Sequence, residues 1–193
     1  MKIKNRILYI VIIMGFLGTL YWVEMSPWGS QAVALYNNGY GTFDMKTYDV
    51  NTVETVLRNM KDEGFRVSFN YYIGDYLFVF FFGATQALIS CRIYRNWKKT
   101  SHLKQRMFGL SIGIVILRGI ADVIENTLLF VTIYRYPAIQ NGIITTAGIC
   151  TQVKLWCIRI WIVTILLGMI MKGMEHMATY RKARIDVNGK TKG

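Results

Sequence analysis

Four long stretches of the chain are almost continuously hydrophobic, without alternation of apolar and polar positions. A helix needs roughly 20 apolar residues to cross a bilayer, because it rises about 1.5 Å per residue through a hydrocarbon core of about 30 Å. Helix is the spanning form that satisfies every backbone polar group within such a segment. The pattern therefore predicts an all-α fold, an integral membrane four-helix bundle in one domain, with spans at about residues 6–23, 71–93, 108–133 and 143–171.

The connection between the first and second spans has a helical pattern of its own. Asn51 followed by Glu54 resembles a capping box, and Gly64 is suited to end a helix in a left-handed cap. Apolar residues recur between them at helical spacing, at Val53, Val56, Leu57 and Met60. We expect a short amphipathic outer helix over about residues 52–63, preceded by irregular packed structure over 29–49. It either covers the apolar ends of the spans or acts as a gate or docking surface.

Charge sets the expected orientation. The chain has a net charge of +12, and most basic residues precede the first span, join the second to the third, or follow the fourth. By the positive-inside rule, both termini and a polar tail at 181–193 are cytoplasmic, in a plasma membrane. The orientation of the protein in the lipid bilayer, its expected partner, accounts for where the basic residues lie. We therefore expect no nucleic-acid partner.

Other features limit the chemistry. The first span has a basic start and small residues at 31–34, as a cleaved signal peptide would, but its apolar run is longer than a signal core. Cys91, Cys150 and Cys157 lie in or beside spans, which predicts neither a disulfide framework nor a metal site. With just two histidines, both expected in the cytoplasm, a bis-histidine haem is also excluded, and we expect no cofactor.

The third span contains four strongly polar residues near mid-bilayer: Arg118, Asp122, Glu125 and Asn126. An ionised side chain at the centre of a span costs about 2.5–3.5 kcal/mol on insertion scales, so such residues face the bundle interior and have partners. Positions 118, 122 and 125 follow helical spacing and share one face, which Asn126 flanks.

Depth suggests the partners of these residues. Lys154 in the fourth span lies level with both acids of the third, since each is roughly 13–18 Å below the outer boundary at about 1.5 Å per residue. We predict that Lys154 pairs with Asp122 or Glu125 and that Arg118 bonds Asp122 one turn away. Asp75, on the second span, is expected nearer the outer mouth. Three acids face two bases, so one acid is left over or protonated.

Four further residues are candidates for hydrogen bonds to this cluster: Gln86, Gln152, Thr127 and Thr151. The sequence has no arrangement for nucleophilic or metal catalysis. Three functions stay open. The cluster binds, and moves, a polar or amphiphilic ligand such as a lipid head, a small substrate or a proton; its acids modify a lipid or isoprenoid; or an ion-pair network orients helices in a structural or accessory subunit.

These residues also resemble a family of uncharacterised, mostly bacterial four-span membrane proteins. The shared features are an outer Tyr, a Gly with a following basic residue, an Asp at the start of the second span, an Asp-x-x-Glu-Asn motif in the third and a Lys-Trp pair in the fourth. The matching residues are Tyr48, Gly64, Arg66, Asp75, Asp122, Glu125, Asn126, Lys154 and a displaced Trp156. The resemblance implies the four-span fold and no particular reaction.

Overall fold

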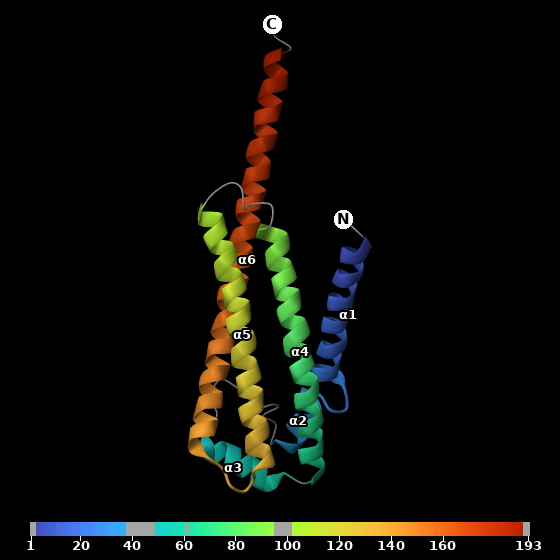
Figure 1. Cartoon of the computed structure of the whole chain (residues 1–193), viewed down its shortest axis with the longest axis vertical. Coiled ribbons are helices and arrows are strands. Elements are labelled where there is room, and N and C mark those ends of the chain that lie inside the picture. Colours follow the sequence, from blue (N-terminus) through green and yellow to red (C-terminus); the bar gives the residue numbers. More distant parts are fainter. Residues whose placement is uncertain (1–2, 38–48, 61, 95–101, 191–193) are drawn as a thin grey trace.

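The computed structural model describes residues 3–37, 49–60, 62–94 and 102–190, and all its regular elements in these ranges are helices. Four long helices run side by side, and two short ones lie at one end of the bundle (Figure 1). The long helices are α1 (Ile3–Met25), α4 (Asp62–Tyr94), α5 (His102–Tyr134) and α6 (Asn141–Lys190); the short ones are α2 (Ser30–Tyr36) and α3 (Val50–Asn59). The predicted all-α four-helix fold is confirmed.

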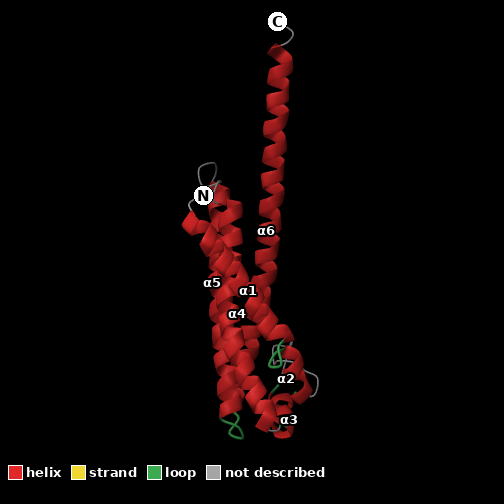
Figure 2. Ribbon diagram, turned by 90° about the vertical axis from the view of Figure 1, so that its right-hand side faces the viewer, coloured by secondary structure: helices red, strands yellow, loops and turns green. Residues whose placement is uncertain are grey.

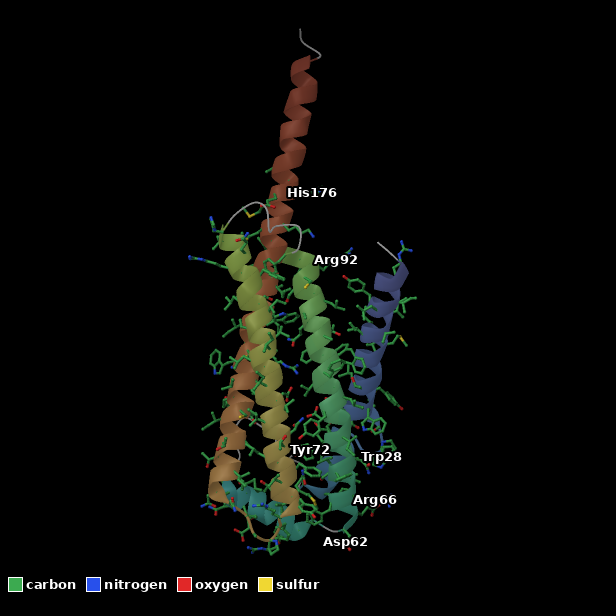
Figure 3. All side chains as sticks on the ribbon, in the orientation of Figure 1. Trp28, Asp62, Arg66, Tyr72, Arg92 and His176 are labelled. Carbon is green, nitrogen blue, oxygen red and sulfur yellow. The ribbon has the colours of Figure 1, made fainter. Side chains whose placement is uncertain are left out.

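Each long helix includes a stretch long and apolar enough to cross a membrane, so the chain has four candidate spans. The N-terminus and the far end of α6 lie at one end of the bundle, and α3 lies at the other. Figure 3 shows the direction of α4, which begins with Asp62 at the α3 end of the bundle and has Arg92 near the opposite end. Beyond the bundle α6 projects alone (Figure 2), so most of the expected tail continues as a helix.

The helices differ in how they are packed. The most extensive contact joins α5 and α6, and the contacts of α4 with α5 and with α1 are similar in extent. Among the long helices, α1 packs chiefly against α4. Glycines let α1 approach α4: the ring of Phe81 lies directly over Gly15, and the ring of Trp22 over Gly74. The core of the bundle is therefore α4, α5 and α6, with α1 added along α4.

The outer helix forms, with different ends from those expected. Its N-cap is Asp49 rather than Asn51, because the Asp49 carboxylate accepts a 2.8 Å hydrogen bond from the Thr52 N–H. The helix ends at Asn59, and Gly64 lies inside α4, where its missing side chain makes room for Met60 and Tyr36. The predicted left-handed cap at Gly64 is therefore wrong.

The apolar stripe of α3 covers one end of the bundle. Val53, Val56 and Leu57 are buried in a cluster with residues of α4, α5 and α6, among them Tyr71, Tyr72, Leu129 and Ile144. Of the segment expected to be irregular, residues 30–36 form α2, because Gln, Ala and Leu favour a helix once Gly29 starts it in an extended conformation. Residues 38–48, including Tyr48, lie outside the described ranges.

Candidate functional site

The six residues singled out in the sequence come together between α4, α5 and α6. Asp75 comes from α4, Lys154 from α6, and Arg118, Asp122, Glu125 and Asn126 from α5; we call these six the charged cluster. All are buried, with exposed fractions of 7% or less. The three helices bring them together because each places its polar residues on the stripe that faces the other two.

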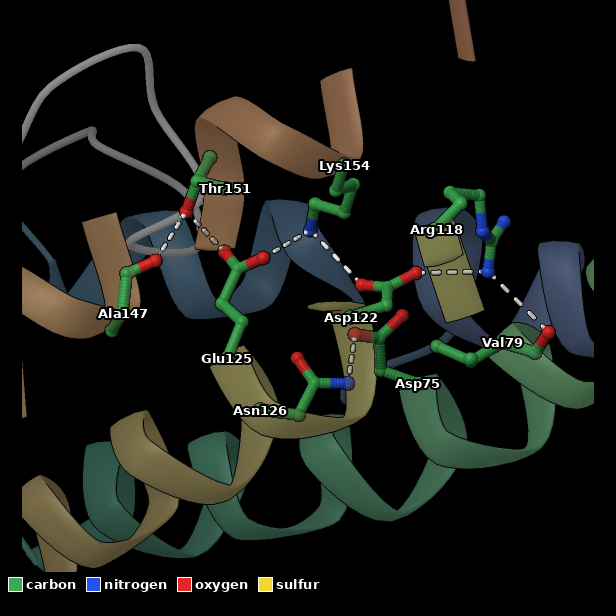
Figure 4. A network of polar contacts seen from close by, with 9 residues as sticks. All are labelled: Asp75, Val79, Arg118, Asp122, Glu125, Asn126, Ala147, Thr151 and Lys154. Carbon is green, nitrogen blue, oxygen red and sulfur yellow. Dashed lines mark hydrogen bonds and ion pairs between the residues drawn. The ribbon is translucent and has the colours of Figure 1, made fainter. Parts of the chain in front are cut away.

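Lys154 joins the two acids of α5. Its Nζ lies 3.1 Å from Asp122 Oδ1 and 2.9 Å from Glu125 Oε2, so it bonds both residues rather than one. Asp122 also accepts a hydrogen bond of 2.9 Å from Arg118 Nη2, one turn along α5. These contacts form a continuous chain from Glu125 to Arg118 (Figure 4). The expected pairings are present.

Groups outside the cluster extend this chain at both ends. Thr151 Oγ1 donates a 2.6 Å hydrogen bond to Glu125 Oε1. At the other end, Arg118 Nη2 donates to the Val79 carbonyl at 3.4 Å, and its guanidinium lies 4.4 Å from the centre of the Phe82 ring. A cation over an aromatic face is stabilised by the quadrupole of the ring. No sequence signal marks Val79 and Phe82, since one contributes its backbone and the other is an ordinary apolar residue.

Asp75 occupies a separate branch. Its Oδ2 accepts a 2.7 Å hydrogen bond from Asn126 Nδ2 across the α4–α5 interface. The structure therefore places Asp75 inside the cluster, level with Asn126, rather than at an open mouth. Arg118 also interacts electrostatically with Asp75 across this interface.

The four residues expected to add hydrogen bonds divide into separate groups. Thr151 belongs to the network, as described above. Thr127 instead bonds the Tyr76 hydroxyl at 2.8 Å on an exposed part of the α4–α5 contact. Gln152 lines a groove on the outer side of α6. Gln86 is buried on α4, about one turn beyond Phe82.

The groove along α6 does not open onto the charged cluster. It has a volume of about 690 Å³ and a mostly apolar lining that runs along α6 from Ile144 to Ile160. Cys157 lines the groove and also lies near Arg118. Among the described lining residues there is neither Asp122, Glu125 nor Lys154. The ion pairs are therefore separated from the groove by α6 itself.

The cluster contains three carboxyl groups and two bases, all buried. A buried charge without a counter-charge is costly in a low-dielectric interior, so an odd acid is a chemically significant feature. Among the described residues, no group of three His, Cys, Asp or Glu side chains is placed to hold a metal ion. The arrangement is suited to holding and exchanging a proton, and to fixing three helices relative to one another.

None of the protein-family models, curated proteins or solved structures compared with this chain matches it. The fold and the site define a multi-pass α-helical membrane protein with a buried charged cluster. Membership of the four-span family that its motifs resemble stays a prediction.

Proposed function

We propose that this membrane protein binds and releases one proton at the charged cluster. The observation that carries the proposal is the ratio of three buried acids, Asp75, Asp122 and Glu125, to two buried bases, Arg118 and Lys154. One bound proton makes the cluster neutral. Ionisable residues inside membrane spans are costly to insert, and proton relays are among the functions that retain them.

The proton belongs to the cluster as a whole, because three acids share two bases. Asp122 accepts hydrogen bonds from both Arg118 and Lys154. Glu125 forms an ion pair with Lys154 and accepts a hydrogen bond from Thr151. Asp75 accepts a hydrogen bond from Asn126 and interacts electrostatically with Arg118.

The surroundings of Asp75 allow its charge to change. Arg118 and Asp122 face it from α5, and Lys154 reaches the same cluster from α6. On the other side of α4, α1 contributes the Trp22 ring beside Gly74. Asp75 lies beside Asp122, and a change in its charge therefore acts on both Asp122 and Arg118, which is at the end of the chain of ion pairs (Figure 4).

The close packing of the cluster favours a proton over a larger ligand. A lipid head or small polar substrate needs volume between the charged groups, but these groups contact one another at 2.9 to 3.1 Å. A proton needs no additional volume. An amphiphile or an acid–base reaction on a lipid would instead require the ion pairs to open.

We further propose that the ends of the chain face the cytoplasm of a plasma membrane. Arg92 at the end of α4, Arg106 at the start of α5 and Lys172 on α6 lie at the same end of the bundle as the start of α1. This asymmetry follows the positive-inside rule. The proton site then lies closer to the outer face.

Infrared spectroscopy of the purified protein in nanodiscs tests the proposal. At pH 7, exposed Asp and Glu side chains are ionised, because their pKa values are about 4, so a protonated carboxyl band at that pH reports a buried acid. We expect the band in the wild type and its loss in Asp75→Asn, which keeps the size of the side chain and leaves two acids with two bases. The proposal would be refuted if the wild-type spectrum lacked this band at every pH between 5 and 8.

The competing account is that the network only holds helices in register. It is favoured by the chain of ion pairs, which connects α5 to α6 directly. Buried ionic groups can fix register without any ligand. In that case the cluster would show no exchangeable proton, and Asp75→Asn would alter stability but not the infrared spectrum in the carboxyl region.

A further inference from the structure

A groove separates α1 from α4 near the N-terminus of α1, away from the charged cluster. Its volume is about 350 Å³, within the range of about 300–1,000 Å³ that is common for small-molecule sites. Two of its lining residues come from α1 and the others from α4; those used below are Tyr9, Ile13, Leu88, Ile89 and Arg92. We call this space the α1–α4 groove.

The groove lies where the close packing of α1 on α4 stops. The Phe81 ring covers Gly15, and the Trp22 ring covers Gly74. As many residues separate the two contact positions on α1 as separate those on α4, so the contacts define one antiparallel register. The groove residues of α1 precede Gly15, and toward this end the two helices diverge (Figure 1). The helices are therefore joined along one half, and the groove opens along the other.

The α1–α4 groove has a charged end and an apolar length. Positions 85, 88, 89 and 92 follow helical spacing and share one face of α4. Arg92 lies near the end of this helix (Figure 3), and Leu88 and Ile89 lie about one turn deeper. In the register set by the glycine contacts, Ile13 is about 14 Å from Arg92 along the helix axes, close to half of a hydrocarbon core of about 30 Å. The groove thus has the polarity of a lipid and the length of one leaflet.

The polar groups at the charged end are available to a ligand. Arg92 is exposed, and neither its guanidinium nor the Tyr9 hydroxyl has an ion-pair or hydrogen-bond partner in the part of the chain that the structure describes. A guanidinium offers N–H groups in a planar arrangement that matches two phosphate oxygens. Arg6, also exposed, is two residues from the level of Arg92 in the same register, about 3 Å along the axis, and adds positive charge.

We propose that an acidic phospholipid occupies the α1–α4 groove, in the leaflet at the Arg92 end of the bundle. Its phosphate binds the Arg92 guanidinium and the Tyr9 hydroxyl, and one acyl chain lies along Ile13, Leu88 and Ile89. Basic pockets between transmembrane helices are suited to anionic head groups. The lipid fills the space that α1 leaves beside α4, and this site is independent of the proton bound between α4, α5 and α6.

Charge favours a lipid over a helix from a second copy of the chain. Copies in one membrane have the same orientation, so the basic end of a second copy would lie level with Arg92 and Arg6. Like charges at the same depth repel each other, whereas a phosphate at this depth is attracted. The groove is therefore complementary in charge to an acidic lipid.

Native mass spectrometry of the full-length protein tests the proposal. The protein is released from detergent micelles in the presence of phosphatidylglycerol or of phosphatidylcholine with the same acyl chains, and the fraction with bound lipid gives the affinity. We expect phosphatidylglycerol to bind more tightly. Arg92→Gln should reduce this preference about fivefold, the contribution of one basic residue at a membrane surface. Ile89→Trp, which fills the apolar part of the groove, should weaken the binding of both lipids.

Arg106→Gln is the matched control, because it removes an exposed arginine at the same end of the bundle, at the start of α5 and outside the groove. It should keep the wild-type preference. Equal affinity of the wild type for both lipids overturns the proposal, as does an equal loss in Arg92→Gln and Arg106→Gln. Competition by glycerol phosphate as strong as that by the lipid overturns the place of the acyl chain. A lipid-free dimer that Ile89→Trp dissociates shows that a second copy occupies the groove instead.

Discussion

Two spans of similar hydrophobicity, α1 and α5, have different environments. In the apolar stretch of α5, 33% of the residues are buried by the rest of the protein, against 11% in the span that begins at Arg6. The described part of α1 within the bundle has no charged residue between Arg6 and Glu24, whereas α5 contains three buried ones. Hydrophobicity marks both helices as spans, and the buried polar residues show which one belongs to the core.

The two helices differ in burial because their side chains have different surroundings. Lipid tails are as apolar as the side chains of α1, so little drives α1 into the bundle except close packing at Gly15 and Gly74. The charged residues of α5 cannot face lipid and must be enclosed by α4 and α6. Polar contacts therefore select the three core helices, and packing alone positions the fourth.

The largest expected effect is at Lys154. Lys154→Met leaves Asp122 and Glu125 without the cation they share, and breaking a buried pair costs about 3–5 kcal/mol. We expect this loss in the free energy of unfolding, measured by denaturant titration in mixed micelles. Arg159→Met is the control, because Arg159 is exposed on the same helix and contacts the Trp156 ring at 5.0 Å. An equal loss in both variants would remove the distinction between core and surface.

A smaller loss is expected at Thr151. Thr151→Val preserves shape and removes the 2.6 Å hydrogen bond to Glu125, and a bond to a charged group contributes about 1.5–3 kcal/mol. Thr146→Val, which removes an exposed bond to the Gly142 carbonyl, should change stability little. The same titration measures both, and a larger effect at Thr146 would contradict the assignment of Glu125 to the core network.

A substitution in α1 should break the contact between α1 and α4 without disturbing the charged cluster between α4, α5 and α6. Gly15→Leu places a side chain where the Phe81 ring lies, and forced overpacking costs about 1–3 kcal/mol. We expect a crosslink between cysteines introduced in α1 and α4 to be lost, while the protonated carboxyl band at pH 7 is retained. Gly18→Leu, where a new Cβ meets no atom within 4 Å, keeps the crosslink. Loss of the band in Gly15→Leu would show that α1 supports the cluster.

The smallest effect concerns the N-cap of α3. The hydrogen bond from the Thr52 backbone holds the pKa of Asp49 below its usual value of 3.8. A lowered pKa in the folded state stabilises the helix above pH 3.8 and loses this contribution as the pH falls through the lower folded value. The protection of the α3 amides against hydrogen exchange, relative to the intrinsic exchange rate at each pH, should therefore fall below pH 3.8 and stay constant between pH 5 and 8. Asp49→Asn, which caps without titrating, should remove that fall.

Sequence reasoning found the core residues because charge inside a span is rare. Arg118, Asp122 and Lys154 are identifiable by depth and helical spacing, and their ion pairs follow from both. Gln86 was singled out as a candidate hydrogen-bonding residue, but the buried pair Ser90 and Ser111 carried no signal, since uncharged polar residues are common in spans. The end of α3 was misplaced because Gly64 has two uses, as a cap and as a close-packing position, and the sequence does not distinguish them.

The number of protonated carboxyl groups at pH 7 tests the central claim most directly. If the cluster is neutral, the band intensity in folded protein follows the excess of acids over bases. Glu125→Gln leaves two acids with two bases and should abolish the band, although Asp75 is unchanged. Lys154→Met leaves three acids with one base and should double it. A band of wild-type intensity in both variants would contradict the account.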